Sequence, residues 1–445
     1  MKIEQYINNY HEGKSDWFID EVKSVANQQR VQKIFELKDY LDGKHKILNR
    51  PNETYNGKVF SPRKIVLQYA KTILNFQASY LLQNPVTLTG REGIVKRYQA
   101  VKKKGNYDKV NYNILDKVIK YGKVAEYVYL DDNKKVKSKV FDPADSYYIY
   151  DHENVLVAFV EAYMTDGVDY YNVITTDKVE KYDNLGGQFT KRSEHENLSG
   201  LPIVYHNQNE LSDVEGKSDL EDLIPIVDNM EDLLSKYTDS FYKYMNPIPV
   251  LIGQQLKGEG LPRDVVGGGV TLEEYGDMKM LSNSMDYQSF NTLYKTLLQG
   301  LLDITSTPAV SMNKTDISNL SEVSIKLLFS LANVKAGINE MFMREGILER
   351  FDKIAKLLEI KGEPLSEEDV DSLDVVFRYN MPMNEKELIE NLKMLHDMGA
   401  ISLESILDHS PFTEDVTMEL AKLVKSGGLR EKEIESESVT SEIVG

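Results

Sequence analysis

The chain has 445 residues and no cysteine, which excludes disulfide scaffolds, thiolate metal sites and cysteine nucleophiles. The formal net charge is −18, from 53 basic and 71 acidic side chains. Such a balance argues against a tight, sequence-reading nucleic-acid binder, because those proteins gain affinity by neutralising phosphates. No apolar stretch approaches the ~20 residues that span a bilayer, and Met1–Glu12 shows no secretory signal. We therefore expect no membrane partner and synthesis in a cytoplasm.

The length predicts about three structural units, of which residues 1–217 form the first, an α+β region. From 123 to 207, β-branched and aromatic runs alternate with Asp, Asn and Gly, which predicts an antiparallel meander of five or six strands. The segments before it are predicted as short amphipathic helices over 1–48, a loop over 49–62, a helix from Ser61-Pro62 to Asn84-Pro85, and a helix over 108–121.

Two long helices with a small insert between them are predicted next. The i, i+3/i+4 spacing of apolar residues runs over 218–245, with Ser218 as N-cap and a kink at Pro225. Residues 246–285 contain two strand-like runs, PIPVLIG and VTLEEYG, around a glycine-rich link. The second helix covers 286–304.

The remainder is predicted to be mainly helical. A polar loop over 305–320 precedes a very long helix that begins at Ser321 and ends near 360, with a weak point at Gly346. Three short helices follow at 384–397, 402–408 and 414–425. The Glu- and Ser-rich tail, 426–445, has a composition typical of disorder.

Enzyme motifs are weak in this sequence. The Gly-Lys-Ser triplets lack the glycine that a P-loop needs five positions earlier, and the His-Glu pairs lack the second His of a zinc protease. His45 has the setting of an ordinary loop or surface residue. Asp142, Asp145 and Asp151 could converge on a divalent cation, while Asx turns between strands explain them at least as well. A metal-dependent cytosolic enzyme that uses these three aspartates is the alternative function.

Four short segments fit, in order, the pattern of one known family: YLDGKHKIL at 40–48, SYLLQNPV at 79–86, EGKSDLE at 215–221 and ISLES at 401–405. With the order of the predicted parts, the chain resembles tailed-phage portal proteins of the family typified by the portal of the Bacillus phage SPP1. The match covers about residues 30–425. A third interpretation is a bacterial helical scaffold protein without a DNA role, and the oligomeric state in solution separates these alternatives.

The resemblance implies an α+β, mainly helical fold with named parts. These are a wing at 1–217, stem helices at 218–245 and 286–304, a clip at 246–285, a tunnel loop at 305–320, a long helix and crown at 321–425, and the tail at 426–445.

The resemblance also implies a non-enzymatic ring, typically of twelve subunits, at one capsid vertex. Double-stranded DNA is packaged and ejected through such a ring. The implied location is the virion, with assembly in the host cytoplasm, and no cofactor or metal is implied. The implied partners are further copies of the chain, the terminase large subunit, a head-completion adaptor, the major capsid and scaffolding proteins, and DNA held without sequence preference.

Three sets of site residues follow. The two long helices cannot bury all their apolar surface against each other, so neighbouring subunits would complete the burial. The ring-interface candidates are therefore Met230, Leu234, Tyr237, Phe241, Phe290 and Leu297. The tunnel-loop candidates are Ser311, Asn313, Lys314, Thr315 and Asp316; their single basic residue favours a weak, movable contact over a phosphate grip. Lys236, Lys243, Lys295 and Lys326 are candidates for the tunnel wall, and ordinary solvated lysines are their plainer interpretation.

Overall fold

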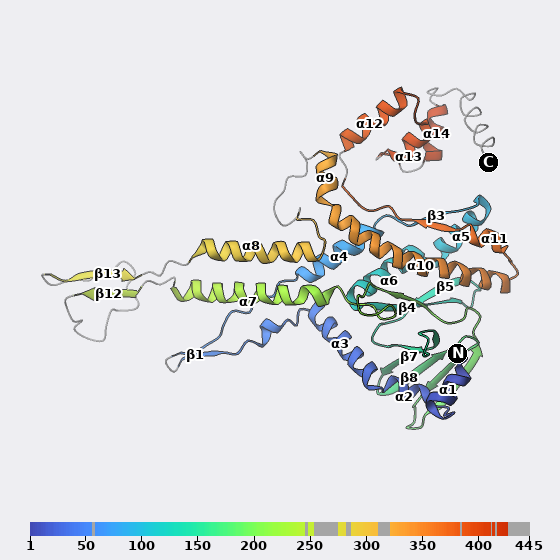
Figure 1. Ribbon diagram of the computed structural model, residues 1–445, viewed down its shortest axis with the longest axis horizontal. Helices are drawn as coiled ribbons and strands as arrows, with labels where there is room; N and C mark the ends of the chain where they lie inside the picture. The colour runs from blue at the N-terminus through green and yellow to red at the C-terminus, as the bar shows by residue number, and fades with distance from the viewer. Residues whose placement is uncertain are drawn as a thin grey trace. The chain divides into compact units, whose positions relative to one another are not determined.

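The computed structural model describes residues 1–55, 58–244, 248–252, 275–281, 286–309, 321–382, 385–410, 412–413 and 416–425. It divides into two compact units (Figure 1). The first contains residues 1–308 and 331–380, and the second contains 309–330 and the described residues from 381 onward. The mixture of helices and antiparallel sheets confirms the predicted α+β, mainly helical class. No helix of the described residues is long and apolar enough to cross a membrane.

The chain begins with the predicted short helices. They are α1 (Ile3–His11), α2 (Trp17–Val22), α3 (Val25–Leu41) and the short 3-10 helix η1 (Lys46–Asn49). Ser24 caps α3 by accepting a hydrogen bond from the backbone N–H of Asn27. Trp17 and Phe18 are buried in a cluster with Ile149 and Tyr171, so these helices cover one face of a sheet.

The predicted meander is two sheets rather than one. The strands of a five-stranded antiparallel meander are β6 (Ser146–Tyr150), β7 (Leu156–Thr165), β8 (Val168–Ile174), β9 (Lys178–Asp183) and β10 (Thr190–Glu196). The second sheet has the order β11-β4-β5, from β11 (Ile203–His206), β4 (Lys123–Leu130) and β5 (Val136–Val140). The last strand thus returns to pair with the first, a long-range pairing that local sequence patterns do not reveal.

The region before the sheets differs from the prediction at one place. Helix α4 begins at Tyr69, not at Ser61-Pro62, and ends at Leu82. Residues 62–68 are not helical, and a hairpin of β1 (Glu53–Tyr55) and β2 (Lys58–Phe60) occupies the predicted loop. Helices α5 (Glu92–Gly105) and α6 (Tyr107–Tyr121) follow. Strand β3 (Thr87–Thr89) pairs with β14 (Asp374–Val376), which lies after α11 (Glu367–Asp371).

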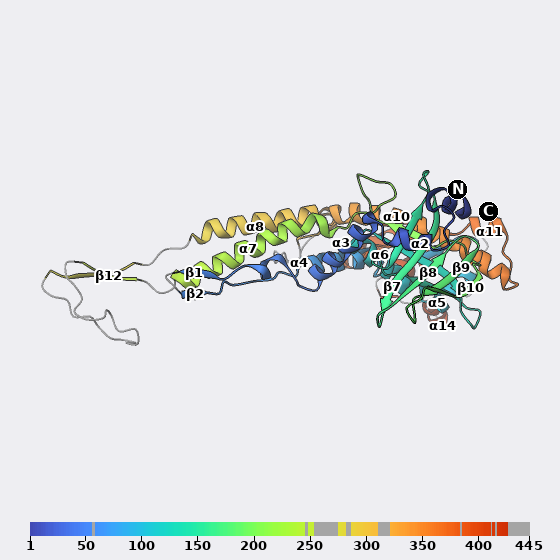
Figure 2. The ribbon, with the colours of Figure 1, turned by 90° about the horizontal axis from the view of Figure 1, so that it is seen from below.

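Both predicted long helices are present. They are α7 (Leu220–Tyr244) and α8 (Tyr287–Ile304), and they lie side by side in both views (Figures 1 and 2). Asp286 caps α8 by accepting a hydrogen bond from the backbone N–H of Ser289. Strand β12 (Ile248–Ile252) confirms the first predicted strand of the insert over its described residues, and it pairs with β13 (Asp277–Leu281). Most of the predicted strand VTLEEYG lies outside the described residues.

The predicted very long helix is two helices, α9 (Glu322–Leu328) and α10 (Ser330–Ile360), which are separated at Phe329. Ser321 caps α9, as predicted. Gly346 is not a weak point: α10 continues through it, and the ring of Tyr205 lies against its backbone. A Cβ atom at Gly346 would stand 2.1 Å from Cε1 of Tyr205, so the glycine permits close packing.

A buried polar network fixes α10 to the three-stranded sheet. The guanidinium of Arg350 donates to the Glu126 carboxylate (2.9 Å), the Asn111 side-chain oxygen (2.7 Å) and the Tyr205 hydroxyl (3.0 Å). The hydroxyl of Tyr205 also donates to Glu126, at 2.7 Å. Both charged side chains are almost fully buried, with exposed fractions of 3% for Arg350 and 0% for Glu126. Each buried charge therefore has its partner within the chain.

The second unit contains the three predicted short helices. They are α12 (Glu385–Asp397), α13 (Leu403–His409) and α14 (Val416–Lys425). Ser402 caps α13 by accepting a hydrogen bond from the backbone N–H of Ser405, at 3.2 Å. The predicted loop residues 310–320 and the tail 426–445 lie outside the described residues.

Candidate assembly surface on the paired helices α7 and α8

The two halves of α7 differ in what covers them. The first half contacts α4, α6 and η1, and its apolar residues Leu220, Leu223, Val227 and Met230 are 0% exposed. Farther along, the exposed fraction rises to 50% for Phe241. One amphipathic stripe is thus covered by the chain itself at its start and uncovered at its end.

An aromatic seam joins α7 to α8. The ring of Tyr237 stacks on that of Phe290, with centroids 3.8 Å apart and planes at 21°. Phe290 in turn neighbours Tyr294, whose hydroxyl is hydrogen-bonded to that of Tyr69 at 2.9 Å. Stacked and offset aromatic pairs of this kind stabilise packing beyond the area that they bury. Two predicted interface residues, Tyr237 and Phe290, therefore contact each other within the chain.

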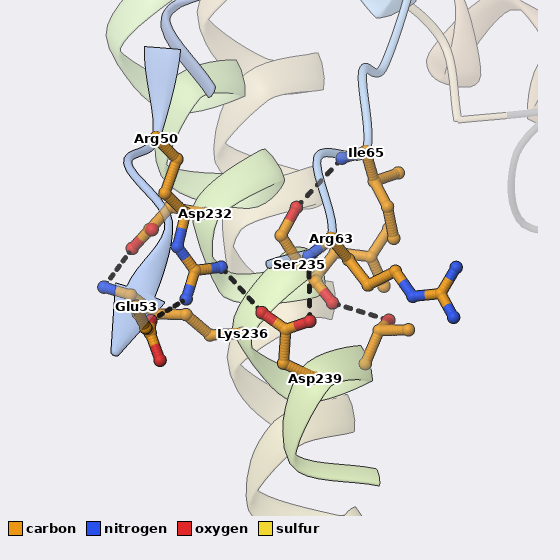
Figure 3. A network of polar contacts seen from close by, with 10 residues as sticks. Arg50, Glu53, Arg63, Ile65, Asp232, Ser235, Lys236 and Asp239 are labelled. Atoms are coloured by element: carbon orange, nitrogen blue, oxygen red, sulfur yellow. Dashed lines mark hydrogen bonds and ion pairs between the residues drawn. The ribbon is translucent and has the colours of Figure 1, made fainter. Parts of the chain in front are cut away.

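An extended segment, residues 62–68, lies along α7, and we call it the strap. Its alternate backbone N–H groups donate to polar side chains on one face of the helix (Figure 3). The three bonds join Arg63 to Asp239 (2.8 Å), Ile65 to Ser235 (3.0 Å) and Leu67 to Glu231 (2.7 Å). Two residues of extended chain advance about 6.6 Å and four residues of helix about 6.0 Å, so the two repeats nearly match.

Arg50 ties the start of the β1–β2 hairpin to the same face of α7. Its guanidinium donates to the second carboxylate oxygen of Asp239 at 2.9 Å and to Glu53 at 2.8 Å (Figure 3). Asp239 is 3% exposed, and both its oxygens accept hydrogen bonds. A buried carboxylate is costly unless it is paired, so this arrangement specifies where the strap meets α7.

The other end of the strap lies beside a buried histidine. His45 is 1% exposed, so the expectation of a loop or surface residue is wrong. Its Nδ1 is 2.5 Å from the Glu231 carboxylate, and its ring stacks on Tyr40 with centroids 3.9 Å apart. Burial raises the pKa of Glu231, although hydrogen bonds from Leu67 and His45 oppose the shift. The sequence alone did not identify Glu231, Ser235 and Asp239 as hydrogen-bond acceptors for the strap. The pattern that could have indicated them is a polar residue at every fourth position along one face of α7.

The six ring-interface candidates fall into three groups. Met230 is fully buried within the chain, so it is not available to another subunit and is removed from the set. Tyr237 and Phe290 contact each other, and Leu234 and Leu297 are partly buried. Phe241 is half exposed. The exposed apolar residues of the pair that prediction missed are Tyr242, Tyr287 and Leu293, with exposed fractions of 52%, 64% and 49%.

The basic and loop candidates are only partly described. Lys236 is exposed and forms an ion pair with Asp232 at 2.7 Å, which agrees with an ordinary surface lysine. Lys295 and Lys326 are exposed. The side chain of Lys243 lies outside the described residues, as do all five tunnel-loop candidates, Ser311, Asn313, Lys314, Thr315 and Asp316.

The three aspartates of the alternative enzyme do not form a cation site. Asp142 accepts hydrogen bonds from Lys38 (2.6 Å) and from the backbone N–H of Ala144 (2.9 Å). Asp151 accepts two backbone N–H bonds in its own turn. These are the Asx turns that the sequence offered as the second explanation. Among the residues that the structure describes, no group of three or more His, Asp or Glu side chains could hold a metal ion.

The pKa of Asp142 agrees with its structural role. Burial acts to raise it, and the hydrogen bonds from Lys38 and the backbone of Ala144 outweigh burial, so the pKa is lowered. Burial and the nearby charge of Asp142 raise the pKa of Asp145. The ammonium groups of Lys38 and Lys117 balance the Asp142 charge.

The paired long helices are attached to an α+β region and carry a small two-stranded insert between them. The model of one family, "Phage portal protein, SPP1 Gp6-like", matches residues 20–430. The chain belongs to this family of phage portal proteins, which are structural components of virions. No curated protein sequence matches the chain.

The solved structures to which this chain is similar include three from gene transfer agent particles. The neck of an empty particle computed with C6 symmetry is 9% identical, with a TM-score of 0.47, over 75% of this chain and 86% of that chain. The virion of a native particle is 9% identical, with a TM-score of 0.44, over 75% and 87%. The neck of a native particle computed with C12 symmetry is 9% identical, with a TM-score of 0.45, over 76% and 89%.

Proposed function

We propose that copies of this chain form a closed ring at one capsid vertex, through which double-stranded DNA is packaged and later ejected. Membership of the portal family supports this role. The observation that carries it is the apolar surface of the paired helices, where Phe241, Tyr287 and Leu293 remain about half exposed or more although α7 and α8 already contact each other. Burial of this surface against a neighbouring copy would stabilise a ring.

A second exposed apolar face in the first unit agrees with lateral contacts. Leu331, Val334 and Met341 on α10 are 51%, 61% and 66% exposed. Their spacing of three and seven residues places them on one side of the helix. A head-to-tail contact between two different faces, repeated about an axis, closes a ring when its rotation divides a full turn. Twelve subunits is the number that we propose, as is typical of portals.

The charge of the chain fits a conduit that does not hold its cargo. At −18 per copy, the assembled ring would repel duplex DNA on average and keep it mobile. In this proposal the tunnel loop at 305–320 makes a weak, movable contact through Lys314. Lys236, Lys243, Lys295 and Lys326 remain candidates for the tunnel wall.

The proposed partners follow from the same role. The clip at 246–285 would dock the terminase large subunit during packaging and a head-completion adaptor afterwards. The sequence contains no P-loop, so the energy for packaging would come from that separate motor. Capsid and scaffolding proteins would surround the ring, which would assemble in the host cytoplasm before it becomes part of the virion.

Electron microscopy of the purified full-length protein tests the proposal. We expect closed rings with a central channel in negative stain, and a mass of many subunits by size-exclusion chromatography with light scattering. The same measurement on protein co-expressed with capsid and scaffolding components covers assembly that needs them. Compact monomers or dimers under both conditions would overturn the proposal.

A further inference from the structure

A basic hollow lies on the first unit, where three elements far apart in sequence meet. It has a volume of about 200 Å³ and is formed by the later part of α5, the turn between β4 and β5, and the end of α10. Its charged lining is five basic side chains, Arg97, Lys104, Lys134, Lys135 and Lys361, against one carboxylate, Glu363. In a chain with 71 acidic and 53 basic residues, this local reversal of sign is not expected from composition.

Ordinary structural roles account for only some lysines near the end of α5. Lys102 donates to the backbone oxygen of Val86 at 2.6 Å and pairs with Asp108 at 2.8 Å. Lys137 donates to the backbone oxygen of Lys104 at 2.8 Å, so a neighbouring strand already satisfies this helix end. The ammonium groups of Lys104, Lys134 and Lys135 have no carboxylate within ion-pair distance among the described residues.

The single acid of the hollow shows that an oxyanion fits there. The Glu363 carboxylate is 2.8 Å from the Lys361 ammonium and 3.9 Å from the Arg97 guanidinium. The hydrogen bond from Lys361, together with the charges of Arg97 and Lys104, lowers the pKa of Glu363 although burial opposes this. Its side chain is 45% exposed, so an incoming anion could compete for the same basic groups.

We propose that this hollow binds phosphate groups, either those of a nucleic-acid backbone or free phosphate. Lysine ammonium groups are point charges that bind phosphate without reading bases, so the site would have no sequence preference. The lining also has four apolar residues: Val136 and Leu358 are 6% and 3% exposed, Val101 is partly buried and Ala100 is exposed, so the hollow presents no large exposed apolar side chain as an anchor. This chemistry favours phosphate over an acidic peptide, which usually adds apolar contacts to its charges.

The hollow is separate from the proposed contact surface on α7 and α8, and it lies at the end of α10, whereas the exposed apolar face of α10 runs from Leu331 to Met341 near its start. The end of α10 lies at the opposite end of the first unit from β12 and β13, and α7 and α8 extend between (Figure 1). Binding at the hollow therefore goes beyond passage of DNA through a ring. It needs only one chain, so a failure to form rings would not affect its test.

The test measures binding of a fluorescent 20-base-pair duplex to full-length protein by anisotropy, from low to moderate salt. The variant carries Lys134→Gln and Lys135→Gln. The matched control carries Lys23→Gln and Lys71→Gln, which remove the same charge from exposed lysines elsewhere in the first unit. Circular dichroism checks that both remain folded.

We expect the hollow variant to bind duplex at least about tenfold more weakly at low salt and the control to bind as wild type. The slope of log K against log salt should fall by about 1.8, which is about 0.9 for each lost phosphate contact. Glu363→Gln, which removes the competing carboxylate, should tighten binding about threefold or more.

A second arm titrates inorganic phosphate alone and follows its binding by calorimetry. Phosphate binding that Lys134→Gln with Lys135→Gln abolishes, without duplex binding, assigns the hollow to free phosphate and supports the proposal. The proposal would be overturned if the hollow variant bound duplex as tightly as the control does and also bound phosphate as tightly as the control does. A poly-glutamate peptide that binds more tightly than duplex, and is lost in the same variant, would also overturn it and assign the hollow to an acidic protein.

Discussion

The sheet region and the paired helices differ in which side chains they bury: the sheet region buries charged groups, and the paired helices leave large apolar groups exposed. Where α10 meets the three-stranded sheet, two charged groups, Arg350 and Glu126, are buried and form an ion pair within one chain, through one of the two Glu126 carboxylate oxygens. Along the outer half of α7 and on α8, large apolar side chains such as Phe241 and Leu293 remain exposed. The first region pairs its buried charges within the chain, whereas the second presents an exposed apolar surface of the kind that a partner covers.

The strap, residues 62–68, connects the sheet region to the paired helices. It belongs by sequence to the sheet region, but its backbone is bonded to the polar face of α7 through Glu231, Ser235 and Asp239. Three polar side chains of α7 thus have hydrogen-bond partners within the chain, while part of its apolar stripe remains exposed. The strap therefore holds the outer half of α7 through contacts within one chain.

The largest expected effect comes from removing the buried ion pair between α10 and the three-stranded sheet. Arg350→Met removes the charged partner of the Glu126 carboxylate, which is 0% exposed. We expect the free energy of unfolding to fall by about 3–5 kcal/mol. The fluorescence of Trp17, the only tryptophan and 4% exposed, measures the transition in urea. Glu126→Gln combined with Arg350→Met should recover part of the loss. A single variant as stable as wild type would show that the network is dispensable.

The next effect separates assembly from folding. Phe241→Asp places a charge in the proposed contact between copies, so we expect rings to decrease at least about tenfold. The Trp17 transition should stay unchanged, because Phe241 is half exposed within its own chain. Light scattering measures the assembly. Leu211→Asp, at a residue 94% exposed in a loop, is the control. Normal rings from Phe241→Asp would place the interface elsewhere.

A smaller effect concerns the strap. Asp239→Ala removes the acceptor for the Arg63 amide and for the Arg50 guanidinium, and we expect a local loss of about 1.5–3 kcal/mol. Ser235→Ala removes only the acceptor of Ile65 and should cost about 1 kcal/mol. Hydrogen exchange reads each amide separately. Asp239→Ala should speed exchange at Arg63 far more than at Leu67, and equal acceleration at both would mean that the strap opens as one unit.

Local patterns were sufficient for the regular helices. The spacing of apolar residues predicted α7 and α8, and side-chain caps at Ser24, Asp286 and Ser321 mark helix starts in the structure. The strap was mistaken for the start of a helix because Ser61-Pro62 has the composition of a helix N-terminus. Its actual partners lie about 165–175 residues away on α7, and no local pattern carries that information.

The candidate interface was predicted in part for a related reason. Periodicity identifies the apolar stripe of α7, but it treats Met230 and Phe241 alike. They differ because the chain buries Met230 completely and leaves Phe241 half exposed, although the strap and α8 contact other residues of the outer half of α7. His45 shows the same limit: its burial depends on a contact with Glu231, 186 residues away. Which residues the chain covers by itself is a property of tertiary structure.

The smallest expected effect is that of a substitution at Lys314, in the sequence between α8 and α9. Lys314 is the one basic residue among the tunnel-loop candidates, so Lys314→Ala removes at most one phosphate contact. We expect a change of severalfold or less in DNA packaged or retained per particle, with ring formation unaffected, since the substitution leaves the apolar surface of α7 and α8 intact. Quantitative PCR of nuclease-protected DNA measures it. Lys314→Arg keeps the charge and should behave as wild type. Equal packaging by the alanine variant would leave a steric role as the only role for this loop, because a charge that can be deleted without consequence does not hold the DNA.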